Sequence, residues 1–314
     1  MTSSRLRANS ETKAMLDVRV AGCRVEPIDR WASWLRHRAN FGDQEDRVAL
    51  QRQLVKRRDR VLDRARVGPG DVVLDLGSGD GLVAFGALIR EPTCKVVLCD
   101  ISEDVLAEAR ARAQQLGVVQ RCSFVHTSAE RLVGITDRTV DVVTICALLI
   151  HIADKRACFT ECARVMRVGG RLSVFEPVNR VGYPDPPETF WGYDIEPVAP
   201  IAAKLRAFYD QYIPPRTDPM LDFDEHDLVE YAVAAGFSEI KLDYRLHISR
   251  RLQPRTWEVF LGTEWNPRSP SLGDAMREVL TEQETAAFEA HLRPLIEVGR
   301  GSRRSAVAYL SAIR

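Results

Sequence analysis

Three glycines and an aspartate near residue 80 carry the clearest chemical signal in the sequence. Residues 71–81 read DVVLDLGSGDG, so Gly77, Gly79 and Gly81 alternate with other residues. Glycines let a ligand approach the backbone without a Cβ in the way, and the first turn of a following helix offers free N–H groups and a positive helix end. Asp75 adds a carboxylate near the end of the preceding apolar run. The pattern predicts a ligand site at a turn between a strand and a helix.

A second acidic residue stands at the spacing that binds a ribose in nucleotide-binding proteins. Asp100 follows the apolar run 95–99, KVVLC, and lies 21 residues after Gly79 (100 − 79). An acid at this offset, at the tip of the second strand of an α/β unit, accepts hydrogen bonds from the ribose hydroxyls. The alternative role is a helix cap, but Ser102 fits that role because acidic residues follow it in the first turn. We therefore expect Asp100 to bind a ribose.

One histidine follows directly after a long apolar run. His151 comes after residues 140–150, VDVVTICALLI, which we expect to form one buried strand. Ligands of open α/β sheets lie outside the carboxyl ends of the strands. An imidazole at such a position can serve as a general base, because its ordinary pKa is near neutrality. Shaping of a substrate pocket and a structural hydrogen bond are the two other roles that the sequence allows.

The elements that must position these residues alternate in type along the chain. Apolar runs typical of strands begin near residues 72, 95, 122, 140, 171, 237 and 305, with helical patterns between most of them. This alternation indicates the α/β class. Residues 28–66, before the first strand, show helical spacing. Within them the run 56–60, KRRDR, is interpreted as a solvent-facing helix surface, because an aspartate interrupts it and apolar residues flank it.

The glycine run departs from one nucleotide-binding pattern and matches another. Leu82 occupies the place of the third glycine in the dinucleotide fingerprint G-x-G-x-x-G. VLDLGSGDG instead resembles motif I of the class I S-adenosylmethionine-dependent methyltransferases, hydrophobic-x-D-x-G-x-G-x-G. The later run ALLIHIADKRACFTECARVMRVGGRLSVFEPVNR is similar to strands four to five of many bacterial methyltransferases. The resemblance implies a doubly wound, mostly parallel sheet of seven strands, Rossmann-like, with the last strand antiparallel.

The resemblance also implies a set of cofactor contacts. S-adenosylmethionine would contact Asp75, Gly77, Ser78, Gly79, Asp100, Ile101, Ser128, Ala129, Glu130 and Cys146. The family often has an aspartate where this chain has Ser128, and that aspartate receives the adenine amino group. A serine hydroxyl accepts a hydrogen bond but brings no charge, so we expect backbone groups around Ala129 to take part in adenine recognition.

Insertions around the core predict four segments. These are an N-terminal helical cap over 1–66, a cofactor-binding core over 67–178, an aromatic lid insertion over 179–223, and the rest of the core over 224–314 with a helical insertion at about 250–300. The lid prediction rests on prolines and aromatic residues, which suit an apolar substrate and exclude water. A self-packed excursion, or a subunit contact in a homodimer, is the alternative.

The predicted substrate contacts come from the cap, the end of the fourth strand and the lid. They are Trp34, His151, Trp191 and Tyr193. His151 is also the first candidate for a catalytic base, ahead of Tyr193 and Glu176. Methyltransferases of small molecules commonly cover the active site with an N-terminal helical segment, whose inner surface here would hold Trp31, Trp34 and Phe41. The alternative is that the tryptophans anchor this segment to the core.

Composition narrows the classes of function. The 314 residues carry 44 Lys and Arg against 44 Asp and Glu, a neutral balance that argues against a dedicated nucleic-acid binder. The sequence lacks both an apolar run long enough for a membrane span and a signal-peptide core. We therefore expect a cytoplasmic protein with reduced cysteines and no membrane partner. We expect no metal, because no convincing carboxylate pair of the kind used by catechol methyltransferases is recognisable.

These observations predict transfer of a methyl group from S-adenosylmethionine to O or N of a small apolar or aromatic acceptor, of natural-product type. Three other interpretations stay open. Arsenite methylation requires several thiols above the cofactor, and an RNA or protein methyltransferase requires an open basic groove. A non-catalytic protein that binds S-adenosylmethionine requires no catalytic residue at all.

Overall fold

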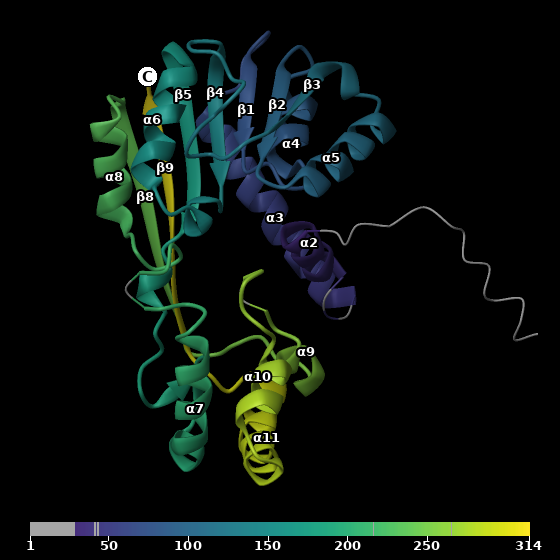
Figure 1. The fold of residues 1–314 in the computed structure, drawn as a ribbon, viewed down its shortest axis with the longest axis vertical. Helices are drawn as coiled ribbons and strands as arrows, with labels where there is room; N and C mark the ends of the chain where they lie inside the picture. Colours follow the sequence, from purple (N-terminus) through teal and green to yellow (C-terminus); the bar gives the residue numbers. More distant parts are fainter. Residues whose placement is uncertain (1–28, 41, 43, 216, 265) are drawn as a thin grey trace, which may run out of the picture.

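One mixed sheet forms the centre of the structure. The computed structural model describes residues 29–40, 42, 44–215, 217–264 and 266–314. The sheet has seven strands in the order β3-β2-β1-β4-β5-β9-β8 (Figure 1). They are β1 Val72–Leu76, β2 Lys95–Asp100, β3 Cys122–His126, β4 Val140–Cys146, β5 Met166–Pro177, β8 Ser238–Ser249 and β9 Arg303–Ile313. Pairing is parallel from β3 to β5, and β9 is antiparallel to both neighbours, which confirms the predicted fold class.

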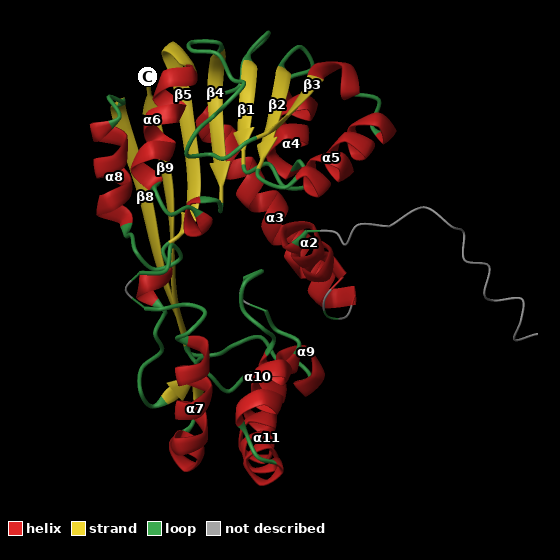
Figure 2. Cartoon of the chain, viewed as in Figure 1, coloured by secondary structure: helices red, strands yellow, loops and turns green. Residues whose placement is uncertain are grey.

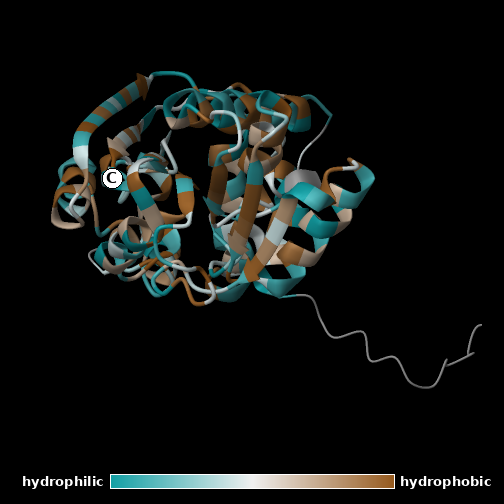
Figure 3. Cartoon of the chain, turned by 90° about the horizontal axis from the view of Figure 1, so that it is seen from above, coloured by the Kyte–Doolittle hydropathy of each residue, from teal (hydrophilic) through white to brown (hydrophobic). Residues whose placement is uncertain are grey.

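Helices cover both faces of this sheet (Figure 2). The adjacent β1 residues Val73 and Leu74 belong to different hydrophobic clusters, because successive side chains of a strand point to opposite faces. The cluster of Val73 includes residues of α3 Gln44–Ala65, α4 Leu82–Arg90 and α5 Glu103–Gln115. The cluster of Leu74 includes residues of α6 Lys155–Val165 and α8 Glu225–Ala234. Figure 3 shows the apolar strands between these helices.

Several helices begin where the sequence places a capping residue. The Ser102 side chain accepts a hydrogen bond from the backbone of Val105 at the start of α5. Asp224 begins α8 with a capping box, and Thr281 with Glu284 forms another at the start of α11 Glu282–Glu297. Such caps satisfy N–H groups that have no partner within the helix. Local sequence therefore fixes these boundaries.

The prediction of a single strand over 140–150 is wrong. β4 ends at Cys146, Ala147 has a positive φ of 59°, and a one-turn 3-10 helix, η2 Leu149–His151, follows. The buried carboxylate of Glu176 accepts hydrogen bonds from the N–H groups of Leu148 and Leu149 at 2.8 and 2.9 Å. The backbone thus turns away from the sheet because a side chain on β5 takes the place of a ladder partner. This turn sets the position of His151.

Two insertions that are far apart in sequence form one further unit, which we call the helical module and define as residues 189–209 and 257–297. It contains the hairpin β6 Thr189–Phe190 and β7 Tyr193–Asp194, η4 Glu196–Val198, α7 Ala199–Tyr209, α9 Trp257–Leu261, α10 Leu272–Val279 and α11. Both stretches contribute to one hydrophobic cluster, separate from the two clusters of the sheet. The module lies beyond the edge to which the parallel strands point (Figure 1).

Two connections next to sheet strands contain short 3-10 helices, η1 Val119–Arg121 before β3 and η3 Asn179–Val181 after β5.

None of the helices in the described ranges combines the length and the apolar character that crossing a bilayer requires.

Candidate active site

The glycine turn is held in a backbone conformation that needs glycine. Gly77, Gly79 and Gly81 have φ values of 66°, 52° and 83°. A Cβ on Gly77 would lie 2.6 Å from Cδ1 of Leu148. Residue 77 must therefore be glycine for two reasons: its positive φ disfavours other residues, and Leu148 leaves no room for a side chain. The N–H groups of Gly77 and Ser78 donate to the carbonyl of Cys99 at 2.8 and 3.0 Å. The turn is therefore fixed against the end of β2.

Asp100 is oriented by the same turn. Its Oδ2 accepts from the N–H of Gly79 at 2.9 Å, and its Oδ1 accepts from the N–H of Ser102 at 3.0 Å. Burial raises its pKa, while these backbone hydrogen bonds oppose the rise. The carboxylate thus has a fixed direction, and each oxygen keeps a lone pair for a further donor. Because Ser102 caps α5, Asp100 does not serve as the cap of that helix, and its role as a ribose ligand stays a prediction.

Asp75 lies underneath the turn and not on its surface. Its side chain is 2% exposed and accepts hydrogen bonds from the Ala84 backbone at 2.9 Å and from Oγ1 of Thr144 at 2.8 Å. Burial raises its pKa to about 7. This carboxyl group joins β1, the first turn of α4 and β4. It acts on the predicted cofactor site through the loop that it holds.

The other predicted cofactor contacts surround the turn and its rim. Ile101 follows Asp100 with 53% of its surface exposed, which leaves an apolar side chain free at the rim. Ser128 Oγ already accepts from the N–H of Glu130 at 3.2 Å, and Oε1 of Glu130 accepts from the N–H of Asp154 at 2.8 Å. The Ser128 hydroxyl is therefore part of a local turn, and adenine recognition by backbone groups here stays a prediction.

His151 lies against the N-terminal helix α2 Arg30–Asn40. The imidazole is in edge contact with the rings of Trp31 and Trp34, at centroid distances of 5.0 and 6.3 Å. Burial, with Arg268 and Arg38 nearby, lowers its pKa to about 4. Within the described residues neither ring nitrogen has a hydrogen-bond partner, and Nδ1 is buried. The structural hydrogen bond that we considered is thus not formed there, and the ring is neutral at neutral pH.

The helix α2 also reaches the glycine turn. Cδ1 of Leu35 is the nearest atom to a Cβ built on Gly79, at 3.8 Å. Asp29, just before α2, accepts from the hydroxyl of Ser102 at 2.5 Å, and its own N–H donates to Asp104 at 2.7 Å. The N-terminal segment is therefore tied to the start of α5, and α2 contacts both the glycine turn and His151. Phe41, predicted beside the tryptophans, lies outside the described residues.

Glu176 is the most deeply buried acid of this edge. It is 0% exposed, its Oε2 has no hydrogen-bond partner among the described residues, and burial raises its pKa to about 7. Its Oε1 holds the turn before His151, as described above. These contacts give Glu176 a positioning role, and they place it behind the turn that carries His151.

Two predicted substrate contacts lie in the core of the helical module. Tyr193 is buried, with its ring edge-on to Phe260. The ring of Trp191 stacks on Phe190 at 5.1 Å and also contacts Tyr209 and Phe260. Trp34 and His151, in contrast, contact each other at the sheet edge. The structure thus brings two of the four residues together, and the packing of the other two agrees with a self-packed insertion.

Sequence reasoning missed a group of arginines at this edge. Arg38 on α2, Arg57 on α3 and Arg268 in the second insertion all lie close enough to influence His151 or Cys146 electrostatically. Arg57 belongs to the KRRDR run that we interpreted as a solvent-facing surface. Its position one turn before the buried Val61 is the signal that would have placed it on the inner face.

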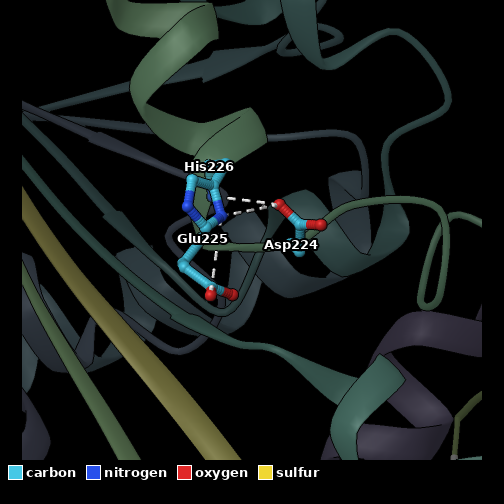
Figure 4. Close-up of side chains that lie close together, drawn as sticks. All are labelled: Asp224, Glu225 and His226. Carbon is cyan, nitrogen blue, oxygen red and sulfur yellow. Dashed lines mark hydrogen bonds and ion pairs between the residues drawn. The ribbon is translucent and has the colours of Figure 1, made fainter.

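One set of three side chains in the described ranges has the spacing of metal ligands, Asp224, Glu225 and His226 (Figure 4). Oδ1 of Asp224 already accepts from the backbone N–H groups of His226 and Asp227 at 2.9 and 3.2 Å. The His226 side chain is 85% exposed. Asp224 thus serves the capping box of α8, and Nδ1 of His226 lies 3.9 Å from Oδ1 of Asp224 and 3.6 Å from Oε1 of Glu225.

Comparison with known proteins agrees with this geometry. Residues 73–170 match a family described as a methyltransferase domain. The ubiquinone/menaquinone biosynthesis C-methyltransferase UbiE of Escherichia coli O1:K1 is 38% identical over 117 residues, which are 37% of this chain and 46% of that protein. The chain thus matches less than half the length of these curated relatives.

Solved structures resemble the fold over a longer stretch. A candidate methyltransferase of Bacillus halodurans C-125 superposes with a TM-score of 0.50 and 20% identity, covering 82% of this chain and 98% of that one. The YcgJ protein of Bacillus subtilis gives a TM-score of 0.50 with 16% identity, covering the same shares. The glycine turn, the oriented Asp100, the sheet order and the family match agree. Residues 73–170 therefore form a class I S-adenosylmethionine-dependent methyltransferase domain.

Proposed function

We propose that the whole chain transfers the methyl group of S-adenosylmethionine to a small organic acceptor bound beside His151. The observation that carries this proposal is the cluster of His151, Trp31 and Trp34 at the carboxyl edge of the sheet, next to the turn that orients Asp100. Apolar and aromatic walls with few polar groups are typical of sites for small molecules. An aromatic or apolar acceptor fits these walls.

The residues present fit the cofactor. The Asp100 carboxylate has lone pairs for two hydroxyl groups, the exposed Ile101 offers an apolar face for a planar base, and the glycine turn leaves room for a ligand close to the backbone. S-adenosylmethionine supplies a methyl group that its sulfonium already makes electrophilic. The protein's contribution is then to align the acceptor and to exclude water, which the cap helix α2 supports.

The state of His151 limits its possible chemistry. With a pKa of about 4 the imidazole is neutral near pH 7, so it can accept a proton, but only weakly. It suits an acceptor whose hydroxyl is itself acidic, such as a phenol, or a role in shaping the pocket. An amine acceptor needs no base, because it reacts once it arrives unprotonated.

The acceptor atom is tested with a panel of compounds. Oxygen and nitrogen acceptors follow from the sequence analysis, and the name of the Escherichia coli relative adds carbon. Phenols, hydroquinones and arylamines would be incubated with S-adenosylmethionine labelled in the methyl group. Label in a small product supports the proposal, whereas label only in added RNA or protein would contradict it. Cofactor binding without transfer to any compound of the panel favours the non-catalytic interpretation.

Calorimetric titration with S-adenosylhomocysteine tests the cofactor site separately. Asp100→Ala is expected to weaken binding by about a hundredfold, because it removes an acceptor of charge-assisted hydrogen bonds. Glu103→Gln is the matched control, since Glu103 is an exposed acid three residues away, and it should bind like the wild type. Equal affinities of Asp100→Ala and the wild type would contradict the ribose role.

A further inference from the structure

Two arginines from different helices each lie against an aromatic ring near the carboxyl edge of the sheet. The guanidinium of Arg57 lies 4.4 Å from the ring centroid of Phe175, and that of Arg38 lies 4.8 Å from the ring of Trp34. Phe175 on β5 is paired with Cys146, the last residue of β4. Trp34 contacts His151, and Phe175 is the sheet partner of Cys146, so both rings border the candidate site.

These two cations lie within electrostatic range of each other, and neither forms an ion pair with a described residue. Burial and the charge of Arg57 lower the pKa of Arg38. Asp80 of the glycine turn and Cys146 act on the same group and oppose this shift. Among the described residues, neither guanidinium takes part in an ion pair or a hydrogen bond. Two other arginines of α3, the helix of Arg57, do form ion pairs: Arg58 with Asp59, and Arg64 with Asp243.

This arrangement is unfavourable without an anion. Both side chains are partly buried, so their mutual repulsion is screened less than it would be in water. A guanidinium that stacks on an aromatic ring keeps its N–H groups free at its edge, in a planar fork that matches a carboxylate. The ring contacts also fix both side chains, so less conformational entropy is lost when an anion binds.

We propose that Arg38 and Arg57 form a receptor for a carboxylate group at the methyl-transfer site. This inference rests on the proposed function. The carboxylate has two possible sources: an acidic group on the acceptor, or the amino-acid carboxylate of the cofactor. In the first case the acceptor is an aromatic acid, with its ring against Trp31 and Trp34 and its carboxylate on the arginines.

Two pairs of ligands distinguish the sources. S-adenosylhomocysteine carries the amino-acid carboxylate, whereas 5′-methylthioadenosine keeps the adenosine and the sulfur but lacks it. Benzoate serves as a probe for an acidic aromatic acceptor, and benzyl alcohol is its uncharged counterpart. Each would be titrated into the wild type and into Arg38→Gln and Arg57→Gln, with benzoate added both to the ligand-free and to the S-adenosylhomocysteine-loaded protein.

Arg52→Gln is the matched control, because Arg52 is an exposed arginine on the same helix. Thermal unfolding of each variant shows whether it folds. Arg57→Lys provides a second test: it keeps the charge but loses the planar fork, so it should recover only part of the binding.

A cofactor source predicts that both Gln variants bind S-adenosylhomocysteine about tenfold or more weakly, while 5′-methylthioadenosine binds unchanged. An acceptor source predicts unchanged binding of S-adenosylhomocysteine and loss of benzoate binding, with benzyl alcohol unaffected. Unchanged binding of both carboxylates in both folded variants, or an equal loss in Arg52→Gln, overturns the proposal. Failure of S-adenosylhomocysteine to bind the wild type would contradict the proposed function instead, and benzoate binding to the ligand-free protein would still test the receptor.

Discussion

At the scale of single residues, two buried carboxyl groups hold the backbone around the site. Asp75 supports the glycine turn, and Glu176 supports the turn that carries His151. The pKa of each is raised to about 7, and burial is the main cause. Their hydrogen bonds to backbone N–H groups oppose this shift. Each acid thus combines a local geometric function with a dependence of stability on pH.

Glu176→Gln should change how stability depends on pH. The folded-state pKa is raised from 4.5 to about 7, so the wild type loses stability from this group as pH rises from about 4.5 to 7. Glutamine does not titrate, and its carbonyl can still accept the N–H bonds of η2. The stability of the variant relative to the wild type should therefore rise by up to about 3 kcal/mol across this range. Urea unfolding from pH 4.5 to 8 measures it, and a constant difference would contradict the assignment.

His151 should act in the opposite direction. Its folded-state pKa is lowered from 6.5 to about 4, so the unfolded chain binds a proton more readily below pH 6.5. The wild type should therefore lose stability as pH falls from 6.5 towards 4, and His151→Gln should lose less. His247→Gln, at an exposed histidine of β8, is the control and should follow the wild type. Identical pH profiles for His151→Gln and the wild type would show that the ring is not desolvated.

At the scale of elements, the site depends on how a few turns join strands to helices. The turn between β1 and α4 has three residues with positive φ, and the turn after β4 has Ala147 in the same region. Helix α2 contacts the first turn through Leu35 and the residue His151 after the second turn through Trp31. Each turn is fixed by hydrogen bonds from a neighbouring strand, so its geometry belongs to the sheet as much as to its own sequence.

Alanine at two glycines of this turn should separate folding from binding. Gly77→Ala places a Cβ against Leu148 in addition to the left-handed strain, and we expect a loss of about 3 kcal/mol in the free energy of unfolding. Gly79→Ala meets no protein atom closer than 3.8 Å, so about 1 kcal/mol of backbone strain is expected.

Binding should show the reverse contrast. The Gly79→Ala methyl group would lie on the side of the turn that faces Leu35 of α2, in space that a ligand over the turn would use, so affinity for S-adenosylhomocysteine should fall although the protein stays folded. Gly70→Ala is the control, because Gly70 has a positive φ of 76° with no atom within 4 Å of the added Cβ and lies before β1. Wild-type affinity in Gly79→Ala would show that the cofactor does not pass over this turn.

At the scale of the whole molecule, the chain combines the sheet domain with the helical module. β8 and β9 belong to the sheet at one end and lead into the module at the other (Figure 1). The module has its own hydrophobic cluster, with rings such as Phe190 and Phe288 in edge contact at 5.6 Å. A separate cluster permits the module to lose structure without loss of the sheet domain.

Phe288→Ala tests this separation. Phe288 is 0% exposed in the module cluster, and removal of its ring should destabilise the module by about 3–5 kcal/mol. Because the cofactor turn packs in other clusters, affinity for S-adenosylhomocysteine should stay within about twofold, whereas transfer to the acceptor should fall. A parallel loss of cofactor affinity would show that the two units fold as one.

The sequence by itself determined the features that depend on neighbours along the chain. The glycine turn, Asp100 after β2, the caps at Ser102 and Asp224 and the α/β alternation all follow from local spacing, because they involve hydrogen bonds within a few residues or a strand's own two-sided burial. The fold class was predictable for this reason, and so was the glycine turn.

Only the tertiary structure decided which distant segments meet. It showed that the chain leaves β4 after Cys146, where Glu176 on another strand accepts hydrogen bonds from the N–H groups of Leu148 and Leu149. It placed Trp191 inside a cluster shared by two insertions, and it brought Arg57 beside Arg38 at the sheet edge. Periodicity records which face of an element is buried, but not what that face is buried against. The glycine turn could therefore be predicted from the sequence. The surroundings of the proposed acceptor could be identified only in the folded chain.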